Sequence, residues 1–177
     1  MNRMKDRRRR CRLFLSLVAA AAALLTTLVA GAQGAGKNGS PPKTQSAASE
    51  LPPGSPELIQ PEELAKAMQS SAAAKPIILN VGPRVIYVQA HIPGAGFIGP
   101  TNKPEGLAKL RTRAHSMSHD SFVVIYCGCC PWEHCPNVRP AYQLLKQMGF
   151  TRLKVLYIAT SFGVDWVEKG YPTAKGE

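Results

Sequence analysis

A short apolar run that ends in a cluster of cysteines is the feature that most limits how this chain can fold. Residues 122–126 read Phe-Val-Val-Ile-Tyr, and four cysteines follow within nine residues, at Cys127, Cys129, Cys130 and Cys135. A short run of apolar, β-branched and aromatic residues is typical of a buried strand. In open α/β sheets, ligands bind at the carboxyl ends of the strands. The loop that begins at Cys127 is therefore the predicted functional site.

The first 32 residues have the three-part pattern of a secretory signal peptide. Residues 1–12 are basic, residues 13–30 are almost wholly apolar, and residues 30–32 (Ala-Gly-Ala) supply the small side chains of a cleavage site. An uncleaved N-terminal anchor is the alternative, because about 18 apolar residues can just span a bilayer. Either way we expect a periplasmic or secreted domain, attached to a membrane only if this segment is uncleaved.

The composition changes after this segment. Residues 33–56 are rich in Gly, Ser, Pro, Ala and Lys, which predicts a flexible linker. Residues 57–177 are then the one predicted domain. Residues 1–32 carry seven of the 22 basic side chains but one of the 11 acidic ones, so more than half of the net charge of +11 belongs to the N-terminus. Since no basic stripe with interleaved aromatic residues follows, we expect no nucleic-acid partner.

Strands and helices alternate along the predicted domain. Apolar runs predict strands, apolar residues at helical spacing predict helices, and a turn with a short strand is expected within residues 91–99. Asn137 is the predicted cap of the third helix and Gly149 its stop. This alternation predicts an α/β fold with a mostly parallel central sheet flanked by helices on both faces. The expected strands are 77–81, 122–126 and 153–157, and the expected helices are 60–69, 104–114, 138–148 and 162–169.

Three stretches of this domain resemble the rhodanese family of sulfurtransferases. Residues 90–95 (Ala-His-Ile-Pro-Gly-Ala) are similar to the family's Gly-His-Ile-Pro-Gly-Ala turn, and residues 123–127 to the strand that ends in its catalytic cysteine. Residues 148–156, followed by 166–172, are similar to its Gly-Phe strand and closing Trp…Gly-x-Pro. The resemblance covers about residues 57–175 and implies a single rhodanese-like domain.

The resemblance also implies an activity. It indicates a sulfurtransferase or sulfane-sulfur carrier that works through a persulfide on Cys127 and needs no cofactor. The implied partners are a small sulfur donor, such as thiosulfate or a persulfide, and a thiol acceptor that another protein can carry. Gly128 would allow the tight turn that brings backbone N–H groups to an anion, and Arg139, in the first turn of the next helix, would face an anionic donor.

Two departures from the family pattern qualify this expectation. The family places an Arg about five residues after the cysteine, whereas Arg139 lies twelve residues after Cys127, so the loop is enlarged. The family's Asp-Val-Arg and the Glu-Tyr that follows it are replaced by residues 80–82 (Asn-Val-Gly) and 86–87 (Ile-Tyr), and the joint loss of the Arg and the Glu suggests that a structural ion pair is replaced. The alternative for Cys127 is a buried cysteine that acts as a small apolar side chain. The alternative for Arg139 is a solvated surface arginine.

The other loop cysteines admit three interpretations. Cys129, Cys130 and Cys135 could be thiols that resolve a Cys127 persulfide, or they could form a structural disulfide, most plausibly Cys130–Cys135. They could also bind a metal together with His134, although the spacing is not a standard one for metal ligands and no metal is expected. Cys135 is the second candidate nucleophile, because it lies nearer the following helix and next to His134.

Two other side chains bear on alternative functions. His91 is expected to hold its turn by hydrogen bonds. Trp132 is expected either to cover the site as a lid or to contact a partner. Besides sulfur transfer, the sequence therefore leaves open a thiol–disulfide or metal-binding module that uses the loop cysteines, and a non-catalytic binding module with Trp132 as its contact.

Overall fold

The computed structural model describes residues 51–70 and 75–176. The predicted signal peptide or anchor, residues 1–32, lies outside the described residues, as does the greater part of the predicted linker. Within the described part of the chain, no helix is both long and apolar enough to span a bilayer. The description below concerns the folded unit that contains the loop cysteines.

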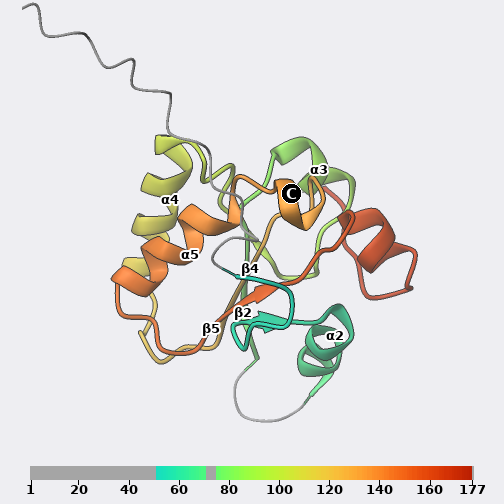
Figure 1. Ribbon diagram of the computed structural model, residues 1–177, viewed down its shortest axis with the longest axis horizontal. Coiled ribbons are helices and arrows are strands. Elements are labelled where there is room, and N and C mark those ends of the chain that lie inside the picture. The colour runs from blue at the N-terminus through green and yellow to red at the C-terminus, as the bar shows by residue number, and fades with distance from the viewer. Residues whose placement is uncertain (1–50, 71–74, 177) are drawn as a thin grey trace, which may run out of the picture. The chain divides into compact units, whose positions relative to one another are not determined.

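Five parallel strands form the central sheet (Figure 1). Their order across the sheet is β1-β5-β4-β2-β3, so β4 lies in the middle between β5 and β2. Because all neighbouring strands are parallel, their carboxyl ends meet at one edge of the sheet. The strands are β1 (Leu58–Ile59), β2 (Ile77–Asn80), β3 (Gly96–Phe97), β4 (Val123–Tyr126) and β5 (Leu153–Leu156).

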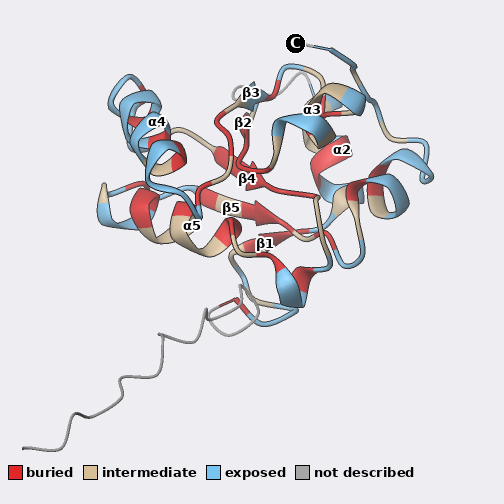
Figure 2. Cartoon of the chain, turned by 90° about the horizontal axis from the view of Figure 1, so that it is seen from above, coloured by how far each residue is buried: buried red, intermediate tan, exposed pale blue. Residues whose placement is uncertain are grey.

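Helices cover both faces of this sheet (Figure 2). On one face lie α4 (Pro104–His115) and α5 (Val138–Gln147). On the other face lie α2 (Pro61–Gln69), α3 (Arg84–Gln89) and the π-helical segment η2 (Gly163–Val167). This arrangement confirms the predicted α/β domain. Helix α3 and strand β1 were not predicted, because the first has no clear apolar stripe in its sequence and the second is only two residues long.

Strand β4 supplies both cores, because its side chains alternate between the two faces of the sheet. Val123 and Ile125 pack with α4 and α5, whereas Val124 and Tyr126 pack with α2, α3 and η2. All four are buried. A strand that is covered on both faces needs apolar side chains at every position, which is why this run is continuous rather than alternating.

The two cores differ in composition. The core against α4 and α5 is largely aliphatic, with Leu110, Leu145 and Val155 fully buried. The core on the other face contains a series of aromatic contacts, in which the Phe162 and Trp166 rings stack with centroids 5.9 Å apart. Trp166 is fully buried, as predicted for a core residue.

The packed part of the chain begins earlier than predicted. Leu51 is buried in the α4–α5 core, and its carbonyl oxygen accepts a hydrogen bond of 3.3 Å from Trp132 Nε1. The end of the predicted 33–56 linker therefore belongs to the folded domain. This contact could not be predicted from the sequence, because Leu51 is a single apolar residue among prolines and small polar residues.

Candidate active site

The cysteine loop leaves the sheet at the carboxyl end of β4 and turns sharply at Gly128. Gly128 has φ of +77°, a region that residues with a Cβ rarely adopt. A Cβ at this position would lie 2.7 Å from Phe162 Cβ, and the Gly128 carbonyl accepts a hydrogen bond of 3.1 Å from Phe162 N. The loop is thus closed against the segment before η2, and only glycine fits at the turn.

The Cys127 sulfur lies beneath the loop rather than on its surface. The Cys127 side chain is 2% exposed. Asn137 Nδ2 donates a hydrogen bond of 3.3 Å to its Sγ, and Asn137 Oδ1 accepts one of 3.2 Å from Asn102 N. These two contacts orient the amide toward the sulfur. Asn137 is the N-cap residue of α5, as predicted, but its side chain contacts Cys127 Sγ and Asn102 N and makes no capping hydrogen bond.

Asn80 supports the loop from the neighbouring strand β2. Its Oδ1 accepts a hydrogen bond of 3.0 Å from Gly82 N, and its Nδ2 donates one of 3.5 Å to the Cys127 carbonyl. Gly82 lies so close that a Cβ there would be 2.8 Å from the Cys127 oxygen and 3.1 Å from its Sγ. At the positions of the family's Asp and Arg, this chain thus has a neutral amide and a glycine that lets the loop approach β2.

The loop brings the cysteine sulfurs together in a chain. The Cys127 and Cys129 Sγ atoms are 3.1 Å apart, and the Cys129 and Cys130 Sγ atoms are 3.2 Å apart. Cys130 Sγ also contacts the His134 carbonyl oxygen at 3.7 Å. All four loop cysteines are free thiols. Across the described ranges, no set of three or more His, Cys, Asp or Glu side chains has the arrangement of metal ligands.

The pKa values of Cys127 and Cys129 are shifted in opposite directions. Hydrogen bonds from Cys127 and Cys135 lower the pKa of Cys129, whose side chain is half-buried. The neighbouring thiols Cys129, Cys130 and Cys135, together with burial, raise the pKa of Cys127. An anion is best placed on the sulfur that remains in contact with solvent, because desolvation disfavours the charged form. Ionisation is therefore favoured at Cys129 over Cys127.

Cys135, the second candidate nucleophile, is buried at the start of α5. The backbone N–H groups of Asn137 and Val138 point at its sulfur and, like the Cys127 thiol, lower its pKa. Cys129 and burial act in the opposite direction, and the result is a pKa of about 12. The amino-terminal end of α5 thus faces Cys135 rather than Cys127. His134, which could have served as its base, is exposed.

The structure corrects the prediction for Trp132. Its side chain is 3% exposed, not displayed on the surface. It packs edge-on against Tyr157 with ring centroids 5.3 Å apart, and Trp132 N donates to the Ala159 carbonyl at 3.1 Å. Trp132 therefore fastens the loop to the chain that follows β5. It is neither a lid nor an exposed contact for a partner.

His91 holds its turn, as predicted. Its Nδ1 lies 2.9 Å from the Tyr87 carbonyl oxygen, and its ring stacks on the Tyr87 ring with centroids 3.9 Å apart. The Tyr87 hydroxyl donates to the Ala95 carbonyl at 2.6 Å. These contacts connect α3 with the turn.

A small hollow of about 210 Å³ opens beside the cysteine loop. Gly128 and Cys129 line it from the loop, and neither Cys127 nor Arg139 lies among the lining residues. Arg139 is half-buried in the first turn of α5, and its role toward an anionic donor stays a prediction. The rest of the lining comes from α3 and from the start and end of η2: Ile86, Gln89, Ala90, Ser161, Phe162, Gly163 and Val167.

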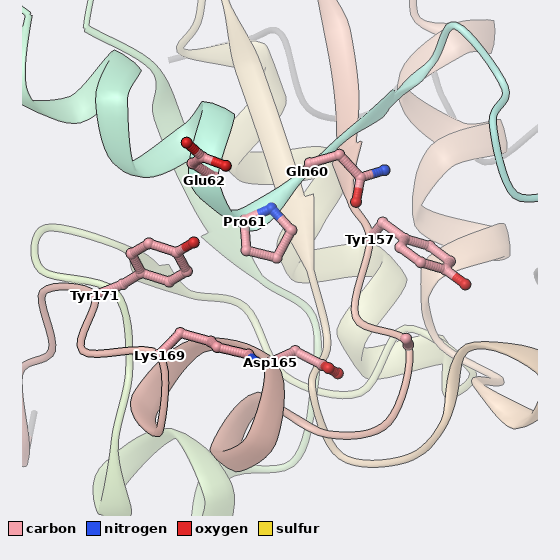
Figure 3. A pocket seen from close by; sticks show the side chains of 8 residues that line it. Gln60, Pro61, Glu62, Tyr157, Asp165, Lys169 and Tyr171 are labelled. Carbon is pink, nitrogen blue, oxygen red and sulfur yellow. The ribbon is translucent and has the colours of Figure 1, made fainter.

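A larger hollow of about 360 Å³ lies on the other side of η2 (Figure 3). Asp165 and Lys169 line it together with Glu62 and Tyr171. Asp165 Oδ2 already accepts hydrogen bonds from the backbone N–H groups of Thr160 and Ser161. No cysteine is among the residues that line this hollow, whereas Cys129 lines the smaller one.

Comparison with known proteins agrees with this geometry. Residues 60–162 match the rhodanese-like domain family, and the chain belongs to that family. No curated protein matches it significantly. It is similar in fold to the crystal structure of the Alr3790 protein from Anabaena sp., with 20% identity and a TM-score of 0.51 over 67% of this chain and 82% of that one. The solution structure of the rhodanese-like domain of the same protein gives 21% identity and a TM-score of 0.50 over 68% and 80%.

Proposed function

We propose that this protein transfers or carries sulfane sulfur through a persulfide on Cys127. The observation that carries the proposal is the position of its sulfur: it follows the central strand of a rhodanese-like domain, it is buried, and it accepts a hydrogen bond from Asn137. The family includes sulfurtransferases. A persulfide needs a donor that stabilises its negative charge and a site that excludes water, and this position offers both.

The proposed chemistry is two successive displacements at sulfur. A loop thiolate attacks the sulfane sulfur of the donor, the donor's S–S bond breaks, and the donor leaves as sulfite or as a thiolate. An acceptor thiolate then attacks the outer sulfur of the protein persulfide and releases the protein thiolate. One sulfur atom moves in each step, and no external oxidant is required.

The lining of the small hollow favours one class of donor. The described residues around it include no cationic side chain: Cys129 is the ionisable group, and Gln89 and Ser161 are polar and neutral. A dianion such as thiosulfate would lose its hydration there without gaining a cationic partner. We therefore propose that the physiological donor is a persulfide, which brings a single negative charge at its sulfur end, and that the acceptor is a thiol.

A thiol–disulfide function is the second candidate, and the sulfur spacing favours it. Sulfurs 3.1 and 3.2 Å apart need to move little to form a disulfide. In that case Cys127 and Cys129 would give two electrons and two protons to a disulfide substrate, which would leave as two thiols.

The cellular location is a further part of the proposal. We propose that residues 1–32 direct export, either as a cleaved signal peptide or as an anchor, so that the domain acts outside the cytoplasm. In such a compartment the loop thiols would need a reducing partner to remain free. The size of the protein isolated from the native membrane and soluble fractions would test this, because cleavage shortens the chain and an anchor retains it in the membrane.

Intact-mass measurement of the reduced protein tests the sulfur-carrier function. Treatment with glutathione persulfide should add the mass of one sulfur atom, and dithiothreitol should remove it. Thiosulfate at the same concentration should add it more slowly. A loss of two hydrogen masses without any sulfur adduct would instead support the thiol–disulfide function.

A further inference from the structure

The two sides of the cysteine loop have different access to solvent. Side chains along β4 alternate, and this alternation continues to Cys127, which joins Val123 and Ile125 in the core beneath α4 and α5. The small hollow lies on the opposite side, against α3 and Phe162, whose side chain belongs to the other core. The Cys127 sulfur is therefore directed away from the opening through which a donor would arrive.

Cys129 connects these two sides. Gly128, with its positive φ, reverses the chain after Cys127 so that the next residue, Cys129, lines the hollow. Its Sγ is nevertheless only 3.1 Å from Cys127 Sγ, and it packs against the same core from the rim. Asn137 Nδ2, which donates to Cys127 Sγ, also lies 4.0 Å from Cys129 Sγ. One amide thus faces both sulfurs.

The pKa shifts of the two thiols agree with this difference in access. Hydrogen bonds from Cys127 and Cys135 lower the pKa of Cys129, whereas those neighbouring thiols and burial raise the pKa of Cys127. The thiolate is the nucleophile in sulfur exchange, so the resting protein presents its reactive sulfur at the hollow. The second sulfur is held as a thiol in the core.

We propose that Cys129 exchanges sulfur with partners at the hollow, and that Cys127 stores it after an internal transfer between the two. This inference rests on the proposed function and assigns a second catalytic residue to it. The Cys129 thiolate attacks the outer sulfur of a donor persulfide, a Cys129 persulfide forms, and the donor leaves as a thiolate.

The internal step is balanced without any further reactant. The Cys127 thiol passes its proton to the outer sulfur of the Cys129 persulfide across their short contact. The Cys127 thiolate then attacks that outer sulfur. A bond from Cys127 to the outer sulfur forms, the S–S bond at Cys129 breaks, and Cys129 leaves as the thiolate that began the cycle. The reverse sequence delivers the sulfur to an acceptor thiol.

Cys130 provides a matched control within the same loop. Its Sγ lies 3.2 Å from Cys129 Sγ, about as near as Cys127 Sγ, yet its side chain does not line the hollow and its sulfur contacts the His134 carbonyl. Replacement of Cys130 by serine should therefore slow sulfur loading much less than replacement of Cys129, which removes the point of entry.

Rapid-quench loading of the full chain with glutathione persulfide tests this inference. Samples are alkylated at increasing times, and fragment-ion masses locate the extra sulfur on Cys127, Cys129 or Cys130. In the wild-type protein the extra sulfur should appear first on Cys129 and then on Cys127. Cys129→Ser should load Cys127 at least about tenfold more slowly, because the accessible thiolate is lost. Cys127→Ser should still load Cys129 and should retain the sulfur there.

Other outcomes would overturn the inference in distinguishable ways. If Cys129→Ser loads Cys127 as fast as wild type and Cys130→Ser do, or if the wild-type protein shows sulfur on Cys127 first, Cys129 is not the point of entry. A Cys127–Cys129 disulfide formed on loading would show attack at the inner sulfur and no internal transfer. If no cysteine of the wild-type protein gains sulfur, the proposed function itself fails.

Discussion

The cysteine loop is packed differently on the two faces of the sheet. Beneath α4 and α5 the loop is fixed by buried side chains: Cys127, Cys135 and Trp132 all enter the aliphatic core. Toward α3 and η2 the loop borders a hollow, and Cys129 is the cysteine that reaches it. The same nine residues thus form an interior on one side and an opening on the other.

This difference suggests why a rhodanese-like domain would have an enlarged loop. Two exposed large apolar side chains, Val164 and Val167, lie on η2, and a third, Val85, lies on α3. The closed side holds a sulfur away from water, while the open side leaves Cys129 beside a hollow. The following predictions test this division, from the largest expected effect to the smallest.

Trp132→Ala should have the largest effect, because Trp132 fastens the loop on the closed side. Loss of a buried tryptophan costs about 3–5 kcal/mol of the free energy of unfolding. Urea denaturation measures the change. Trp132→Phe is the matched control: it keeps an aromatic ring against Tyr157 and loses the Nε1 hydrogen bond to Leu51, so it should cost less. Equal stability of Trp132→Ala and wild type would mean that the loop is not held at this residue.

Gly128→Ala should have the second-largest effect on stability, because Gly128 lies where the loop passes from the closed side to the open one. The substitution adds strain at φ of +77° and a 2.7 Å contact with Phe162 Cβ, so about 1–3 kcal/mol or more should be lost in urea denaturation. Gly94→Ala is the matched control, since Gly94 has φ of +78° and nothing within 4 Å of its Cβ position. If both variants lose the same stability, the contact with Phe162 contributes nothing.

Asn137→Asp should impair persulfide formation on Cys127. It removes the donor at the sulfur and adds a negative charge, but keeps an acceptor for Asn102 N. A hydrogen bond to a charged group contributes about 1.5–3 kcal/mol, so the amount of Cys127 persulfide at equilibrium should fall roughly tenfold or more. Mass spectrometry after equilibration with glutathione persulfide measures it. Asn80→Asp makes the same change beside the Cys127 carbonyl, and an equal loss in that variant would argue against a specific role for Asn137.

Tyr126→Phe should have the smallest effect on stability, and we expect to measure it only at alkaline pH. Burial raises its pKa to about 12, against about 10 for an unfolded chain. Above pH 10 the unfolded chain releases this proton first, so stability falls as the pH rises from 10 toward 12, by at most about 1.4 kcal/mol per pH unit. Denaturation of wild type and Tyr126→Phe at pH 9, 10 and 11 measures the slope. Identical slopes in the two proteins would contradict the prediction.

The sequence predicted the layers of this domain well, because periodicity carries that information. The continuous apolar run at β4 indicated a strand covered on both faces, and Pro61 and Pro104 marked the starts of α2 and α4 within a residue. Strand β1 and the packing of Leu51 were not predicted. Each is too short to form a pattern and is held only by contacts with distant segments.

The candidate site was likewise predicted only in part. The position of the cysteines after β4 was evident from the sequence, and so was the need for glycine at the turn. The direction of each side chain was not. Asn137 had the sequence context of a helix cap and became a donor to sulfur, while Trp132 had the context of an exposed loop residue and entered the core.

The sequence by itself therefore determined the fold class, the edge of the sheet at which the thiols gather and the order in which they leave it. Only the tertiary structure decided that Cys127 faces the core and Cys129 the hollow. The physical reason is that hydrophobic periodicity is a local property of the chain. The surroundings of a loop sulfur depend instead on α3, α5 and η2, elements that are distant in sequence and meet only when the chain is folded.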